Sequence, residues 1–152
     1  MSDDQLLDLL GEVKRLARKY YELTAKPLGV TAEIAEYEAA RLLGLELAPP
    51  RTPGYDAIRK TAAGTELLQI KGRCILPNSK PSQRIGKIDL NKEWDAVLLV
   101  LLDGCFEPTE IFEAKRPAVG QALTLPGSKA RNERGQLGVA KFKSIGHKIW
   151  PT

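Results

Sequence analysis

The stretch Glu66-Leu67-Leu68-Gln69-Ile70-Lys71-Gly72 decides the fold class and contains most of the candidate chemistry. Side chains alternate between the two faces of a β-strand. Leu68 and Ile70 therefore face one side, where they can be buried, and Gln69 and Lys71 face the other. This pattern predicts a strand over residues 66–72 that presents two polar side chains together.

Other strands are expected around this one. Residues 55–60 form a short strand, and the turn 61–64 joins it to residues 66–72 as a hairpin. The unbroken apolar run at 94–102 is typical of a strand buried on both faces. A further strand is predicted at 109–114.

Helical spacing of apolar residues predicts an amphipathic helix over residues 4–24. A second helix is expected from Thr31, as its N-cap, to Leu43, with Gly44 as its stop signal. Residues 117–125 and 135–144 are further helix candidates, and the polar, basic segment 74–92 is expected to be a long loop or an irregular hairpin.

Length and element order predict a single domain over residues 1–152. Its fold class is α/β, a central mixed sheet of four to five strands flanked by helices. The core spans roughly residues 29–115, preceded by the extra N-terminal helix 4–24 and followed by a basic C-terminal segment, 127–152.

Composition excludes several classes of protein. No apolar stretch approaches the roughly 20 residues of a membrane span, and the start of the chain lacks the pattern of a secretory signal, so we expect a cytoplasmic protein that does not bind membranes. Cys74, Cys105 and the one histidine, His147, show no zinc-site spacing, so we expect two reduced thiols.

The net charge of +4 is unevenly distributed. Residues 71–92 and residues 127–152 each contain six basic side chains against one acidic side chain, and the rest of the chain is net acidic. Two basic segments on an acidic body suggest a polyanion as partner. Charge alone is equally compatible with lysine-rich, solvated loops.

Three acidic residues precede the Gln69–Lys71 pair. Glu36 lies on the apolar, small-residue face of the second helix, where a carboxylate is costly unless it is paired or bound to a metal. Glu33, one turn earlier, is an alternative, although an acid in a first turn also suits the helix dipole. Asp56, thirteen positions before Gln69, is brought beside it by the hairpin, and on its own would also fit a turn or the start of a strand.

These side chains suit metal-assisted phosphodiester hydrolysis. Mg²⁺, or Mn²⁺ in its place, prefers oxygen ligands and lowers the pKa of bound water. Asp56 and Glu36 offer carboxylates, Gln69 a side-chain carbonyl and Ile70 a backbone carbonyl. Lys71 could stabilise the transition state or orient the attacking water.

The segments Gly54-Tyr55-Asp56-Ala57-Ile58 and Leu68-Gln69-Ile70-Lys71-Gly72-Arg73, after a helix containing Glu33-Ile34-Ala35-Glu36, resemble the signature of the restriction-endonuclease-like nuclease superfamily. The resemblance covers roughly residues 29–115. It implies a helix–strand–strand–strand–helix–strand core and a site formed by Glu36, Asp56, Gln69 and Lys71. The chain departs from the usual pattern at Gln69, where an acid is common, and so has one negative charge fewer at the metal site.

The resemblance implies an Mg²⁺-dependent endonuclease that cleaves DNA. Phosphate contacts are expected from basic residues of both segments: Arg73, Lys80, Arg84, Lys87, Lys129, Arg131 and Arg134. The alternative is a catalytically weak or inactive module of the same fold that binds nucleic acid or a protein. A third possibility is an interaction protein that docks through its first helix, and a homodimer is compatible with each of these functions.

Overall fold

The computed structural model describes residues 2–25, 27–80, 83–132 and 134–152. Its elements, in chain order, are α1 (Asp3–Thr24), α2 (Thr31–Leu43), β1 (Glu46–Leu47), β2 (Ala57–Thr61), β3 (Gly64–Cys74), β4 (Arg84–Lys87), β5 (Ala96–Leu102), β6 (Pro108–Lys115), α3 (Arg116–Thr124), α4 (Lys129–Asn132), β7 (Gln136–Gly138), α5 (Val139–Ile145) and β8 (His147–Trp150). The expected α/β class is confirmed, with a six-stranded mixed sheet at its centre.

The large sheet has the order β1-β2-β3-β5-β6-β8. Only the pairing of β3 with β5 is parallel, and the other neighbours are antiparallel. The predicted β2–β3 hairpin forms, and β5 is buried along its whole length. The expected four to five strands was an underestimate, because the short strands β1 and β8 join the edges mainly through backbone pairing.

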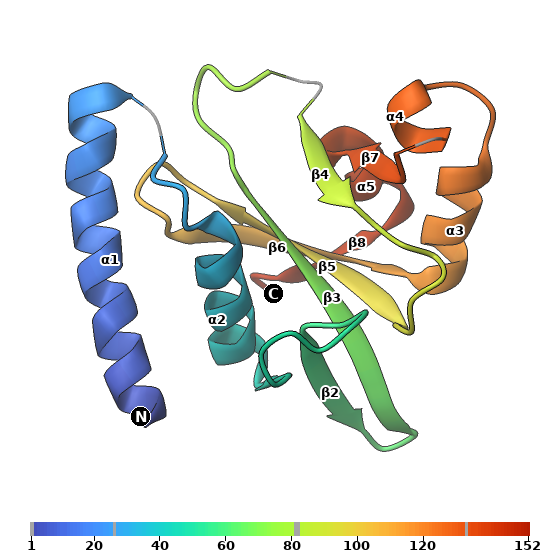
Figure 1. The fold of residues 1–152 in the computed structure, drawn as a ribbon, viewed down its shortest axis with the longest axis horizontal. Helices are drawn as coiled ribbons and strands as arrows, with labels where there is room; N and C mark the ends of the chain where they lie inside the picture. Colours follow the sequence, from blue (N-terminus) through green and yellow to red (C-terminus); the bar gives the residue numbers. More distant parts are fainter. Residues whose placement is uncertain (1, 26, 81–82, 133) are drawn as a thin grey trace.

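Helices cover both faces of this sheet (Figure 1). On one face, α1 and α2 contribute Ala17, Ile34, Ala35 and Ala39 to a core with alternate residues of β3 and β5. On the other face, α3 and α5 pack with β4 and β7 over the remaining sheet residues. Side-chain alternation along β3 thus directs Leu68 and Ile70 towards α2 and places Gln69 and Lys71 on the β4 side.

Both N-terminal helices form close to their predicted limits. In α1, the Ser2 hydroxyl accepts from the Gln5 backbone N–H at 3.3 Å, and the Gln5 side chain accepts from Ser2 N–H at 2.9 Å. This capping box holds the first turn. Gly44 ends α2 in the left-handed region (φ 67°), as expected of a C-terminal glycine. Thr31 is the first helical residue of α2 and not its N-cap, which is Val30.

Three other expectations are corrected. The segment 74–92 is not all loop, because β4 pairs there with β7 as a separate two-stranded sheet. The final helix starts at Val139, since residues 136–138 form β7. A helix was expected before the last core strand, but β5 joins β6 through a tight turn in which Asp103 accepts from the N–H groups of Cys105 and Glu107.

Candidate active site

The candidate site lies where β2 separates from β3. Strand pairing ends at Ala57 and Leu68, and the Asp56 N–H still donates to the Leu68 carbonyl at 2.8 Å. Beyond this point the Asp56 side chain replaces the strand, because its Oδ2 accepts from the Ile70 N–H at 2.8 Å. Asp56 was expected on the strand; it immediately precedes β2 and is fixed against the edge of β3.

The same geometry directs a backbone oxygen to this edge. The N–H and C=O groups of one strand residue leave the strand on the same side. Since the Ile70 N–H reaches Asp56, the Ile70 carbonyl points to the edge on which Asp56 lies. The structure therefore places a carboxylate and a backbone carbonyl on the same edge of β3.

Gln69 contributes a buried amide with an unused oxygen. Its side chain is 8% exposed, and Nε2 donates to the Gly54 carbonyl at 2.8 Å. A carbonyl only accepts, so this bond fixes which amide atom is nitrogen. Among the described residues, Oε1 has no hydrogen-bond partner. A buried acceptor without a partner costs about 1–3 kcal/mol, so Oε1 is available for a ligand.

Lys71 is held next to these groups by a different strand. Its Nζ donates to the Lys87 carbonyl, at the end of β4, at 2.8 Å. Burial lowers the pKa of Lys71, as does the positive charge of Arg73, while the negative charge of Asp56 acts in the opposite direction. The ammonium group is thus partly desolvated and within electrostatic reach of Asp56.

Glu36 reaches the site from α2, which packs very closely on β3. A Cβ atom on Gly72 would lie 2.5 Å from the Cβ of Ala35, so only glycine allows this approach. Burial, together with the negative charges of Asp56 and Glu33, raises the pKa of Glu36 to about 7. Glu36 makes no hydrogen bond or ion pair with any residue that the structure describes.

The sequence left open whether Glu33 or Glu36 is the carboxylate that α2 contributes to the site, and their exposure favours Glu36. Glu33 is exposed, whereas Glu36 is partly buried and feels the charge of Asp56 most strongly. The apolar face of α2 was nevertheless misassigned, because the buried residues are Ile34, Ala35, Glu38 and Ala39. Glu38 is 6% exposed and pairs with Lys14 as well as with Arg41.

Oxygen donors at this edge fit a hard divalent cation. Asp56 and Glu36 supply two carboxylates, Gln69 a buried oxygen without a partner, and Ile70 a carbonyl. In the described ranges, no group of three or more Asp, Glu, His or Cys side chains could hold a metal. Binding at this edge therefore needs the amide and backbone oxygens as well as the two acids.

The two basic segments come together beside the site. β4 pairs with β7, with Arg84 opposite Gly138 and Lys87 opposite Gln136, and Lys87 accepts the Lys71 hydrogen bond. We call β4, β7, helix α4 and the described residues next to α4 (125–128 and 134–135) the basic ribbon. The exposed cations of the basic ribbon are Arg84, Lys87, Lys129 and Arg134. Lys80, which precedes β4 in the chain, is also exposed and is counted with them.

Two of the expected phosphate-binding residues are engaged with the backbone. Arg73 donates from Nε to the Arg84 carbonyl at 2.5 Å and from Nη1 to the Gly72 carbonyl at 2.6 Å. Arg131 donates to the carbonyls of Leu125 and Pro126. Both guanidinium groups shape the basic ribbon, and the exposed cations are better placed for phosphate contacts.

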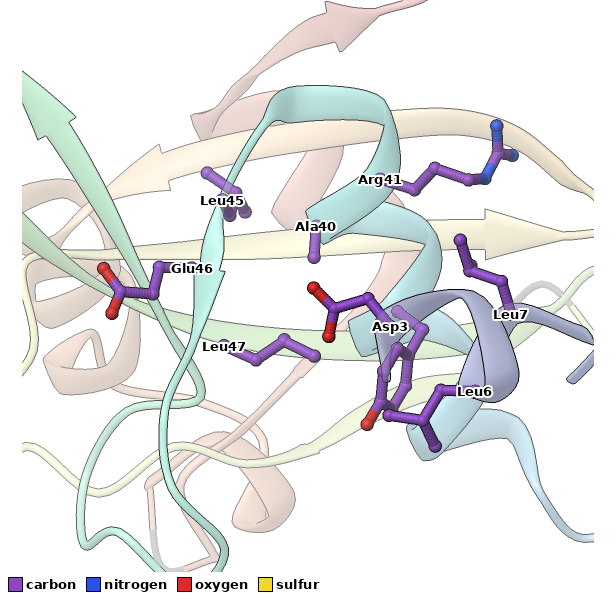
Figure 2. Close-up of a pocket in the computed structure, with 9 residues that line it drawn as sticks. Asp3, Leu6, Leu7, Ala40, Arg41, Leu45, Glu46 and Leu47 are labelled. Carbon is purple, nitrogen blue, oxygen red and sulfur yellow. The ribbon is translucent and has the colours of Figure 1, made fainter. Parts of the chain in front are cut away.

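A pocket elsewhere on the chain belongs to a different region. About 410 Å³ in volume, it lies between the start of α1, the end of α2 and β1 (Figure 2). Its lining includes Leu6, Leu7, Ala40 and Leu47, and no expected site residue.

Sequence reasoning missed the backbone partners of the site. The carbonyls of Gly54 and Lys87 hold Gln69 and Lys71, and a backbone acceptor leaves no residue-type signal. Gly54 itself is a partial signal. It adopts φ 92°, and a Cβ there would lie 2.7 Å from the Glu93 carbonyl.

Comparison with protein-family models and with curated proteins finds no match for this chain. In the described part of the chain, no helix combines the length and apolar character that crossing a membrane requires.

Proposed function

We propose that this protein is a metal-dependent endonuclease that hydrolyses phosphodiester bonds in DNA, with its site at the β2–β3 edge. One observation carries the proposal: the buried Gln69 Oε1, which has no partner, lies on the strand whose edge is fixed to Asp56, and Lys71 follows it on the same face. We also propose that the fold is restriction-endonuclease-like, as the sequence resemblance implies.

Asp56, Gln69, Ile70 and Glu36 would hold Mg²⁺ or Mn²⁺. When bound, the cation would offset the charge of the phosphodiester and acidify a water molecule. Lys71, partly desolvated beside Asp56, would donate a hydrogen bond to a phosphate oxygen as negative charge develops there. The pKa of Glu36 is about 7 in the metal-free protein, so binding of the cation would displace a proton from its carboxyl group near neutral pH.

The exposed cations of the basic ribbon would bind the nucleic-acid backbone. Lys87 is the most informative of them, because its carbonyl holds Lys71 while its side chain is exposed. Phosphate contacts of this kind position a substrate without reading its sequence. Binding should weaken steeply with added salt as counterions are released.

The test is nicking of supercoiled plasmid by the purified protein with Mg²⁺ or Mn²⁺. Lys71→Ala and Asp56→Asn should each reduce the rate by about 100-fold or more, the usual effect of losing a group that stabilises the transition state. Lys60→Ala is the matched control, because Lys60 is an exposed lysine at the far end of the hairpin. Equal nicking by wild type and both site variants would identify a contaminant and refute the proposal.

A non-cleaving binding module is the second candidate. It is favoured by the absence, in the described ranges, of a cluster of three potential acidic metal ligands. A competent site predicts that Mn²⁺ raises the melting temperature and that Asp56→Asn abolishes the rise, because a ligand stabilises the state it binds. Salt-dependent DNA affinity with no response to metal would favour the module.

A further inference from the structure

Helix α1 presents two apolar stripes, and only one of them packs on the body of the protein. Leu10, Val13 and Ala17 pack in the core between α1, α2 and the sheet. Ala17 is the one fully buried residue in the described helix. Few of the 22 residues of α1 are buried, although helices in proteins gain most of their stability by packing an apolar face.

The second stripe, here the outer stripe, is open to solvent. Its exposed fractions are 48% for Leu9, 52% for Leu16, 40% for Tyr20 and 86% for Leu23. Of the seven large hydrophobic side chains that are exposed in the described chain, five belong to α1. Isolated exposed leucines need no explanation, whereas a contiguous stripe of them marks an interaction surface.

The spacing of the outer stripe is that of a helix–helix seam. Leu9, Leu16 and Leu23 recur every seven residues, and Tyr20 lies one turn after Leu16. A seven-residue apolar repeat keeps one line of side chains facing a neighbouring helix. Figure 1 shows α1 at the outside of the molecule, with α2 and the sheet on the same side of it, so a second helix could approach.

Charge determines which helix fits. Glu12 and Lys19 flank the outer stripe on the same side, both are exposed, and neither has an ion-pair partner among the described residues. If two copies of α1 pair antiparallel with Leu16 at the centre, Leu9 meets Leu23 and Glu12 lies beside Lys19, twice. In a parallel pair the two-fold axis would run along the helices and place the Glu12 and Lys19 side chains of the two copies on opposite sides of the seam, so these opposite charges would not meet.

We propose that α1 is a homodimerisation helix, which pairs antiparallel with α1 of a second copy about a two-fold axis at Leu16. The occupant of the outer stripe is thus the same stripe of another chain. The seam is short, since the helix spans about 33 Å, and dimerisation should therefore depend on concentration in the micromolar range. The proposal holds whether or not the chain cleaves DNA.

The first test measures the mass of the full chain by sedimentation equilibrium across a wide range of concentrations. Wild type should shift from 16.7 kDa towards twice that mass. Leu16→Glu should raise the dimer dissociation constant by at least about 100-fold, because it places two carboxylates together on the axis. Leu125→Glu, the same change at a 42% exposed leucine elsewhere, should leave the constant unchanged.

The second test determines orientation through charge reversal. Glu12→Lys alone and Lys19→Glu alone should each weaken the dimer about tenfold, since each turns two attractive contacts into repulsive ones. The double variant, Glu12→Lys with Lys19→Glu, should recover wild-type affinity. In a parallel dimer neither single change would weaken pairing, and that result would overturn the antiparallel arrangement.

Two other results would also refute the proposal. One is a wild-type chain that stays monomeric into the high micromolar range. The other is a chain that is monomeric but co-sediments with anionic lipid vesicles in a manner that Leu16→Glu abolishes, which would make the outer stripe a membrane-binding surface. Far-ultraviolet circular dichroism of each variant shows whether α1 still folds, and unfolding is not expected because every substituted side chain is exposed.

Discussion

Two charged regions on the sheet differ in how their charges are balanced. At the hairpin end, Arg59 and Lys115 face Glu66 and Glu113, two cations against two acids. Arg59 pairs with both acids, and Lys115 lies 3.0 Å from Glu66 and 3.2 Å from Glu113. We call these four residues the balanced network. The hydrogen bond from Arg59 lowers the pKa of Glu66, as does the one from Lys115.

The candidate site has the opposite arrangement. Glu36 is partly buried near Asp56 and Glu33 and has no paired cation among the described residues, and its pKa is raised to about 7. Lys71, which lies within electrostatic reach of Asp56, donates instead to the Lys87 carbonyl. Charges that serve stability are paired in the folded state, whereas uncompensated ones reduce stability and are often found at functional sites. The β2–β3 edge therefore holds an uncompensated carboxylate, in contrast to the balanced network.

The largest expected effect comes from breaking the balanced network. Glu113 is 4% exposed, so Glu113→Ala leaves Arg59 and Lys115 to share one acid in a partly buried position. We expect a loss of about 2–4 kcal/mol in the free energy of unfolding, measured by urea denaturation. Arg59→Ala with Glu113→Ala should cost less than the sum of the single changes. Full additivity would show that the two residues do not act together.

At the candidate site, removing a charge is expected to raise the free energy of unfolding, whereas at the balanced network it lowers it. The folded-state pKa of Glu36, about 7, lies above its ordinary value of 4.5, so the folded state binds this proton more tightly. The stability that it contributes is present below pH 4.5 and is lost as the pH rises through 7. Glu36→Gln should therefore stabilise the protein at pH 8 by about 1–2 kcal/mol, a value reduced because solvent screens a half-buried group.

Urea unfolding of wild type and Glu36→Gln at pH 5 and pH 8 checks this sign. The two curves should lie close together at the lower pH and separate at the higher one. A variant that is less stable than wild type at pH 8 would mean that Glu36 has a favourable partner, and the contrast with the balanced network would disappear.

The sequence predicted local features of the fold better than the packing of its helices. The β2–β3 hairpin, the buried β5 and the limits of α2 follow from alternation, apolar runs and stop signals within each segment. The buried face of α2 did not follow, because Lys14 on α1 pairs with Glu38 and turns that side inward. The edge strand β8 was missed because its pairing partner, β6, lies more than thirty residues earlier.

At the candidate site, only the local geometry could be predicted from the sequence. The proximity of Asp56, Gln69 and Lys71 follows from hairpin geometry, and the structure adds the Asp56–Ile70 hydrogen bond and the electrostatic influence of Asp56 on Glu36. The anchoring of Lys71 to β4 could not be predicted, because it depends on a backbone carbonyl of a segment that reads as a loop. Whether these residues act as a nuclease site stays a prediction.

Adding an acid at the candidate site should increase its difference in charge balance from the balanced network. Gln69→Glu supplies the acid that is common at this position in the signature that the sequence resembles, and it removes the hydrogen bond to the Gly54 carbonyl. Without metal, we expect a loss of about 1 kcal/mol in stability, because a further negative charge joins Asp56 and Glu36. With Mn²⁺, the rise in melting temperature should exceed that of wild type. A smaller rise would indicate that residue 69 is not a metal ligand.

The smallest effect is expected from an ion pair that is balanced but exposed. Lys60 and Glu46 lie 3.5 Å apart, with 77% and 62% of their side chains exposed. Lys60→Ala should change the free energy of unfolding by less than about 0.5 kcal/mol, since solvent screens such a pair and ordering two long side chains offsets the attraction. Urea denaturation in low and high salt measures this. If Lys60→Ala lowered the free energy of unfolding nearly as much as Glu113→Ala, pairing alone would determine the contribution of a charge to stability. The much smaller loss that we expect means that burial and pairing act together. Only then does a partly buried, unpaired carboxylate such as Glu36 reduce stability enough to be informative about function.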